Sequence, residues 1–196
     1  MTATRVFDME RSNLPLLNSL EELARPGVSM GVCLSAAMMW IRETMVRGDM
    51  HSDEVICSNR QIITMRQASY QFESRINHCD YLDLNRTAID RLVEQFHLMT
   101  RFEGEGDLLD FAEIAEVLQC LAGYYLLYFK NPQGDRGHAV AFKFTTSGAG
   151  FLFDPAEGLF RFRDTPSMSL YLRSMNGIGY EAYMGGQFWF RQLALA

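Results

Sequence analysis

The sequence lacks a long hydrophobic run and an excess of positive charge. No apolar stretch approaches the roughly 18 residues that a membrane-spanning helix needs. The first residues, MTATRVFDMERSN, contain no apolar segment that could serve as a secretory signal. Its 18 basic and 24 acidic residues give a net charge of −6, which argues against a nucleic-acid-binding protein that relies on a positive surface. We therefore expect no transmembrane segment and no nucleic acid partner.

Closely spaced cysteines are also absent. The chain has no CxxC pair, which argues against a zinc ribbon or a thioredoxin-like redox motif. His51, His78 and His97 show no metal-ligand spacing with one another, so we expect no metal and no cofactor. The density of cysteine is too low for a disulfide-stapled scaffold, and a reducing compartment is the simpler interpretation. The four thiols are those of Cys33, Cys57, Cys79 and Cys120.

The 196 residues are 48% hydrophobic and 21% charged, a composition typical of one globular domain with a sizeable core. The first part of the chain is dominated by helical patterns. Residues 29 to 47 have apolar side chains at helical spacing, with Ser29 as the expected cap and a Glu43–Arg47 pair one turn apart. Residues 60 to 76 and 86 to 101 carry weaker helical patterns, EGEGD predicts a loop, and residues 108 to 122 give the clearest amphipathic helix, with Leu108 on its apolar face.

After Gly123 the pattern changes to short apolar runs separated by turn signals. YYLLYFK, HAVAFKFTT, FLFDP, LFRFRD and QFWFRQLAL predict strands, and SMSLYLRSM predicts a short helix. Helices followed by an antiparallel sheet indicate an α+β fold. We predict one domain over residues 1–196, with a helical lobe over about 10–122 and a sheet lobe over about 123–196.

Three residues in this arrangement suggest thiol chemistry. Cys33 opens the expected helix in MGVCLSAAMMW, where the helix dipole favours a thiolate over a thiol. His138 begins the HAVAF strand, and Asp154 ends FLFD 16 residues later, the separation expected for neighbouring antiparallel strands. In that position the aspartate can accept a hydrogen bond from one imidazole nitrogen while the other nitrogen takes the proton from a thiol.

The order Cys, His, Asp and the motifs GVCLSAAMMWI, GHAVAF and FDPAEGLFRF resemble those of the YopT-like (AvrPphB-type) cysteine peptidases of the papain-like superfamily. The resemblance implies a papain-like fold, in which the nucleophile lies at a helix N-terminus packed on a C-terminal antiparallel sheet. It implies Cys33 as nucleophile, His138 as general base and then acid, and Asp154 as the residue that orients the imidazole. It also implies a bacterial effector or toxin that cleaves a protein of a host or target cell, such as a small GTPase or a kinase.

One feature departs from the papain-like pattern. Such enzymes usually place a Gln or Asn a few residues before the nucleophile to stabilise the oxyanion, whereas RPGVSMGV has no amide side chain. The expected donors are therefore the hydroxyl of Ser29 and the backbone N–H of Cys33. Losing one such donor typically costs ~100- to 1000-fold in rate, so an inactive papain-like binding module is one alternative.

A second alternative keeps the triad and changes the acceptor, giving a glutamine deamidase or an acyltransferase. The sequence does not separate these activities, because the choice depends on the shape of the cleft and on the nucleophile that reaches the acyl-enzyme. By resemblance we expect export without a classical signal peptide and action in the cytoplasm of a host or target cell; otherwise the protein is expected to be cytoplasmic.

Overall fold

The computed structural model describes residues 3–8, 32–48, 52–76, 81–111, 113–114, 122–134, 137–175 and 180–196. Its centre is a seven-stranded sheet in the order β1-β6-β5-β4-β3-β7-β2, in which every neighbouring pair is antiparallel. The strands are β1 (Ala3–Asp8), β2 (Leu98–Gly106), β3 (Gly123–Lys130), β4 (Gly137–Phe144), β5 (Gly150–Asp154), β6 (Gly158–Phe162) and β7 (Phe188–Leu195). The α+β prediction is confirmed.

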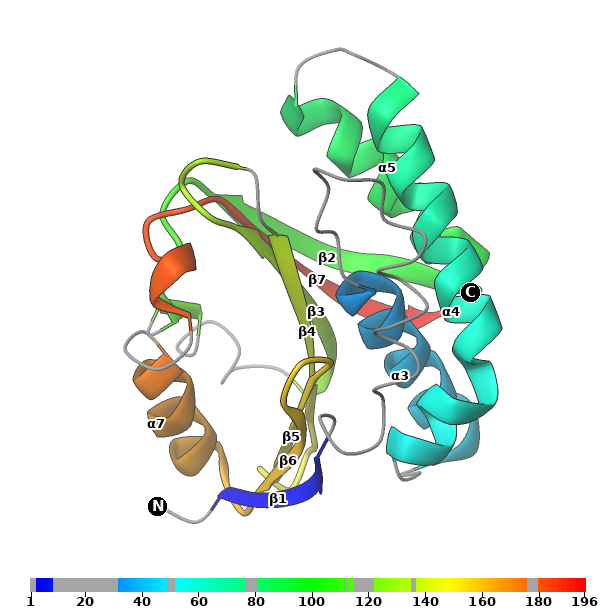
Figure 1. Ribbon diagram of the computed structural model, residues 1–196. Helices are drawn as coiled ribbons and strands as arrows, with labels where there is room; N and C mark the ends of the chain where they lie inside the picture. Colours follow the sequence, from blue (N-terminus) through cyan, green and yellow to red (C-terminus); the bar gives the residue numbers. More distant parts are fainter. Residues whose placement is uncertain are drawn as a thin grey trace.

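Helices cover both faces of this sheet (Figure 1). One face carries α3 (Cys33–Arg47), α4 (Ser52–Ile76) and α5 (Tyr81–Gln95), and the other carries α7 (Thr165–Met175). A short 3-10 helix, η1 (Glu181–Tyr183), precedes β7. Among the described residues, no helix combines the length and apolarity that crossing a membrane requires.

Strand β3 has a buried side chain on both faces, which explains why its sequence is apolar without alternation. Leu126 and Tyr128 join the core under α3, α4 and α5, whereas Leu127 and Phe129 join the core on the α7 face. Helix α3 is buried along most of its length, and Trp40 stacks on Phe153 of β5 with ring centroids 5.6 Å apart. This contact ties the helix that begins at Cys33 to the strand that ends at Asp154.

The strands predicted after residue 123 and the helix at SMSLYLRSM are confirmed. The loop expected at EGEGD is wrong, because its first four residues, Glu103 to Gly106, complete the edge strand β2. Glycines make this pairing possible: a Cβ at Gly104 would lie 2.3 Å from the ring of Phe190, and one at Gly106 would lie 2.5 Å from the ring of Phe188. The rings of β7 therefore occupy the space where side chains of β2 would stand. Strands β1 and β2 show that the sheet also recruits residues from before position 122.

The helix expected over residues 86 to 101 ends earlier than its pattern suggests. Helix α5 stops at Gln95, and His97 adopts a left-handed conformation (φ 55°) that turns the chain into β2. The helix start expected at Ser29 is also displaced, since α3 begins at Cys33 without a side-chain cap. Ser29, Cys79, Cys120 and residues 10–25 lie outside the described residues. Leu108 is 71% exposed, contrary to expectation, whereas Phe111 and Ile114 are buried; residues 115–121 are not described.

Candidate active site

His138 and Asp154 meet at the end of the sheet, on neighbouring strands. Nε2 of His138 lies 2.9 Å from Oδ1 of Asp154, and the same oxygen accepts a hydrogen bond of 2.7 Å from the backbone N–H of Ala156. The turn after β5 closes with the N–H of Glu157 donating to the carbonyl of Asp154 at 3.2 Å. The Asp-Pro-Ala-Glu turn therefore holds the carboxylate in place independently of its contact with the histidine.

Both side chains are withdrawn from water, to 13% exposure for His138 and 2% for Asp154. Burial lowers the pKa of His138, but the charge and hydrogen bond of Asp154, together with the contact from Cys33, raise it well above its ordinary value of 6.5. These contacts favour the charged imidazolium form of the ring. Asp154 Oδ2 is buried and has no hydrogen-bond partner among the described residues.

Cys33, the first residue of α3, lies beside the same histidine from the helical layer that packs on the sheet. Its side chain is partly exposed and lies close enough to His138 to help raise the pKa of the imidazole. Because Nε2 of His138 faces Asp154, Nδ1 is the ring nitrogen left for the thiol. The structure thus brings Cys33, from far earlier in the sequence, to the pair formed by His138 and Asp154.

The first turn of α3 is fixed by a residue that the sequence did not single out. Gln67 of α4 is 3% exposed, and its Oε1 accepts a 3.1 Å hydrogen bond from the backbone N–H of Ser35. The first bond within the helix runs from the N–H of Ala36 to the carbonyl of Val32. Gln67 therefore acts as the N-terminal acceptor that a capping side chain would otherwise supply. A glutamine in the middle of a weak helical pattern gives no sequence signal for this role.

An aromatic group surrounds the histidine ring. Phe129 makes an edge contact with His138 at 5.6 Å between centroids, and Tyr180 and Tyr183 lie at 5.8 and 6.3 Å. The two tyrosines come from the segment around η1. These rings restrict the rotation of the imidazole and keep water away from one side of it. In the described part of the chain, no group of three or more His, Cys, Asp and Glu residues is arranged to hold a metal ion.

No protein-family model matches the chain, and no curated protein matches its sequence. Among solved structures, the Pseudomonas avirulence protein AvrPphB matches with a TM-score of 0.66 and 17% identity, over 90% of this chain and all of that one. PatoxP, a cysteine protease-like domain of the Photorhabdus asymbiotica toxin PaTox, matches with a TM-score of 0.47 and 10% identity, over 97% of this chain and 53% of that one. The chain therefore has the fold of AvrPphB, in agreement with the YopT-like resemblance of its three motifs.

Proposed function

We propose that the protein is a cysteine endopeptidase of the papain-like type, with Cys33 as nucleophile, His138 as general base and acid, and Asp154 as the orienting residue. The observation that carries the proposal is the pair of His138 and Asp154 at 2.9 Å, with Cys33 close enough to the same imidazole to help raise its pKa. The fold shared with AvrPphB supports it.

In this mechanism His138 takes the proton of the Cys33 thiol, which leaves a thiolate beside an imidazolium. The thiolate attacks the scissile carbonyl, and the N–H of Cys33 at the uncapped start of α3 donates to the developing oxyanion. His138 then gives its proton to the leaving amine, which releases the first product and leaves an acyl-enzyme. His138 next takes a proton from water, and the resulting hydroxide attacks the thioester carbonyl; the C–S bond breaks, the second product leaves as a carboxylic acid, and Cys33 returns as a thiolate.

The substrate class follows from the resemblance: a protein of a host or target cell, reached after export of the enzyme. A small GTPase or a kinase is the substrate that the family resemblance suggests. The same acyl-enzyme would serve a deamidase or an acyltransferase, so the identity of the product decides between these activities.

The test combines labelling with product analysis. E-64 should modify the protein once, at Cys33, and this labelling should disappear in the Cys33→Ala variant. Proteome-derived peptides should be cut by the wild type, whereas Cys33→Ala and His138→Ala should leave them intact, because neither half of the ion pair completes the acyl transfer alone. A mass increase of about 1 Da without fragmentation would instead identify a deamidase. A wild type that neither reacts with E-64 nor changes any peptide would contradict the proposal.

A further inference from the structure

A cavity of about 360 Å³ lies where α5 faces the ends of β2 and β7. A smaller cavity of about 150 Å³ adjoins it and shares Arg86, Glu105 and Trp189 with it. Trp189 is 7% exposed and stacks on Tyr128 with ring centroids 5.6 Å apart, so it forms a rigid aromatic wall. Glu105 and Asp107 stand at the cavity as exposed carboxylates. The catalytic arrangement described above uses none of these residues.

The cavity lies at the same end of the sheet as His138. His138 of β4 pairs with Phe129 of β3, Phe129 pairs with Phe188 of β7, and Phe188 pairs with Gly106 of β2. The cavity is lined by Phe188 and Gly106, the last two members of this row. Its Trp189 belongs to the core on the α3 face, against which Cys33 also packs. The nucleophile and the cavity therefore share one face and one end of the sheet.

The spacing of the strands indicates which residue of a bound substrate peptide would reach the cavity. Neighbouring strands are about 4.8 Å apart, so β7 and β2 lie roughly 10 and 14 Å from β4. An extended peptide advances about 3.3 Å per residue. A substrate chain crossing the end of the sheet would therefore present to the cavity the side chain about three or four residues from its scissile bond.

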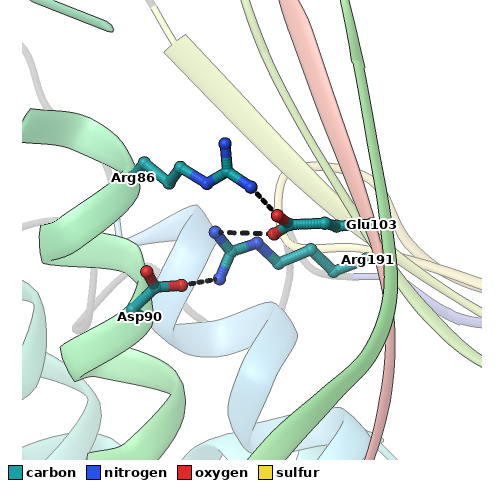
Figure 2. A network of polar contacts seen from close by, with 4 residues as sticks. All are labelled: Arg86, Asp90, Glu103 and Arg191. Carbon is teal, nitrogen blue, oxygen red and sulfur yellow. Dashed lines mark hydrogen bonds and ion pairs between the residues drawn. The ribbon is translucent and has the colours of Figure 1, made fainter. Parts of the chain in front are cut away.

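The charges around the cavity are unequal. Arg86 pairs with Glu103, and Arg191 pairs with Glu103 and Asp90, so these four side chains form a neutral network across α5, β2 and β7 (Figure 2). Glu105 has no ion-pair partner within the described ranges. Asp107 accepts only a long contact of 3.5 Å from the amide of Gln187, again counting described residues alone.

One further cation is close. Nζ of Lys130 lies 5.8 Å from the centroid of Trp189, and burial lowers its pKa to about 8. With Lys130 included, the cavity and the network together contain four carboxylates and three cations. The carboxylates are those of Asp90, Glu103, Glu105 and Asp107, and the cations are Arg86, Arg191 and Lys130. Lys130 is 4% exposed, so its charge is less accessible than those of Glu105 and Asp107, which are both exposed.

We propose that this cavity is a specificity site for a basic side chain of the protein substrate, a lysine or an arginine about three or four residues from the scissile bond. The aliphatic stem of such a side chain packs on Trp189, and its charged end is placed between Glu105 and Asp107. The inference rests on the proposed peptidase function, and it adds the recognition of a cationic residue that the Cys33–His138–Asp154 arrangement does not provide.

The experiment measures which residues the enzyme prefers near its cleavage site and, in parallel, whether the cavity binds a lysine side chain. Peptides prepared from a cell lysate with a glutamate-specific protease keep their internal lysines and arginines, and the positions cut by the wild type are read by mass spectrometry. We expect Lys and Arg to be enriched at one position, three or four residues from the cut. For synthetic pairs, kcat/KM should be about fivefold higher with lysine than with norleucine there, the range of an accessible ion pair. Salt should reduce this ratio.

Two variants and a control locate the effect. Glu105→Gln with Asp107→Asn should remove the preference and leave cleavage of the norleucine peptide unchanged, and Glu105→Lys should favour Asp or Glu at that position. Glu94→Gln with Glu113→Gln removes the same charge from exposed sites elsewhere and should keep the preference. Cleavage without a basic preference, or a preference that survives the Glu105 and Asp107 substitutions, would overturn the proposal.

A binding measurement separates this proposal from the peptidase function. In the Cys33→Ala protein, N-acetyl-lysine methylamide should shift the indole NMR signal of Trp189, and its norleucine analogue should not. The shift should be absent when Glu105 and Asp107 are neutralised. If the wild type cuts no peptide but the shift is present, the peptidase function fails and the cation site stands. If the shift is absent as well, both fail.

Discussion

Oδ1 of Asp154 accepts two hydrogen bonds, one from Nε2 of His138 at 2.9 Å and one from the backbone N–H of Ala156 at 2.7 Å. The carboxylate is therefore oriented by its own turn, and the histidine is oriented by the carboxylate. Substitutions of Asp154 should therefore change the charge of His138 more than they change the fold around it.

The first prediction concerns pH. Burial opposes the charge on His138, but Asp154 and Cys33 raise its pKa well above 6.5, so kcat/KM should fall on the alkaline side only at a pH well above 6.5. In Asp154→Asn the ring loses the charge that raises its pKa, and this alkaline limb should move to lower pH. Steady-state rates on either side of pH 6.5 measure the shift.

The same pKa predicts a dependence of stability on pH. A histidine whose pKa is raised by folding stabilises the native state fully below its unfolded pKa, and the contribution is lost as pH rises through the folded pKa. Asp154→Asn should therefore cost most stability just below pH 6.5, where the histidine is charged and the aspartate is still ionised, and less in alkali.

Asp154→Ala should lower kcat by up to about 100-fold, and Asn should retain more of the rate because an amide still accepts from Nε2. Two folded Asp154 variants with wild-type profiles would contradict the orienting role.

The second prediction concerns Gln67. Gln67→Met leaves the buried N–H of Ser35 without its acceptor, which should cost about 1–2 kcal/mol of unfolding free energy. Because the same turn positions Cys33, kcat should also fall while KM changes little. Gln61→Met, on an exposed position of the same helix, is the matched control and should change neither value. Denaturant unfolding and steady-state kinetics measure the two effects; equal behaviour of the two variants would refute the role of Gln67.

The third prediction concerns the network in Figure 2. Arg191 is 3% exposed and contacts both Asp90 and Glu103, so Arg191→Met should destabilise the fold by about 2 kcal/mol. Arg86→Met should cost less than about 1 kcal/mol, because the Arg86 side chain is 48% exposed and its ion pair competes with water. Thermal or urea unfolding of the two variants checks this order, which the reverse ranking would contradict.

The fourth prediction compares two neighbouring glycines in the turn before β7. A Cβ at Gly186 would lie 1.9 Å from the carbonyl oxygen of Lys130, a backbone atom that cannot move aside easily. Gly186→Ala should cost about 2–3 kcal/mol and lower activity by displacing the segment that carries Tyr183. Gly185 has a φ of +73° and open space around it, so Gly185→Ala should cost only about 1 kcal/mol. Similar losses of stability for both variants would contradict this account.

Much of this arrangement is predictable because its signals are local. The strand of His138 and the turn at Asp154 have clear patterns, and the Glu43–Arg47 pair forms at 2.9 Å as expected. Strand β2 is missed because its glycines are explained only by the rings of Phe188 and Phe190, which are distant in sequence. The end of α5 is missed because a histidine, not a glycine, takes the left-handed position at residue 97.

The site itself shows the same limit. Chemical type and order single out Cys33, His138 and Asp154, but the acceptor that fixes the first turn of α3 comes from the next helix. Its contribution depends on how α4 packs on α3, and no spacing rule within one helix encodes that packing. The aromatic rings beside His138 likewise combine β3 with the segment before β7.

The order of strands has a consequence for how the chain folds. At one edge β1 pairs Ala3 with Phe162, and at the other β2 pairs Leu98 with Leu195. Contacts between residues so far apart in sequence are slow to form, since the intervening chain must be ordered first. Strand β2 has no partner until β7, far later in the sequence, is in place, and Cys33 likewise depends on His138 and Asp154 from the second half of the described sheet. We therefore expect the surroundings of the Cys33 thiol to form late in folding, after the long-range strand pairs.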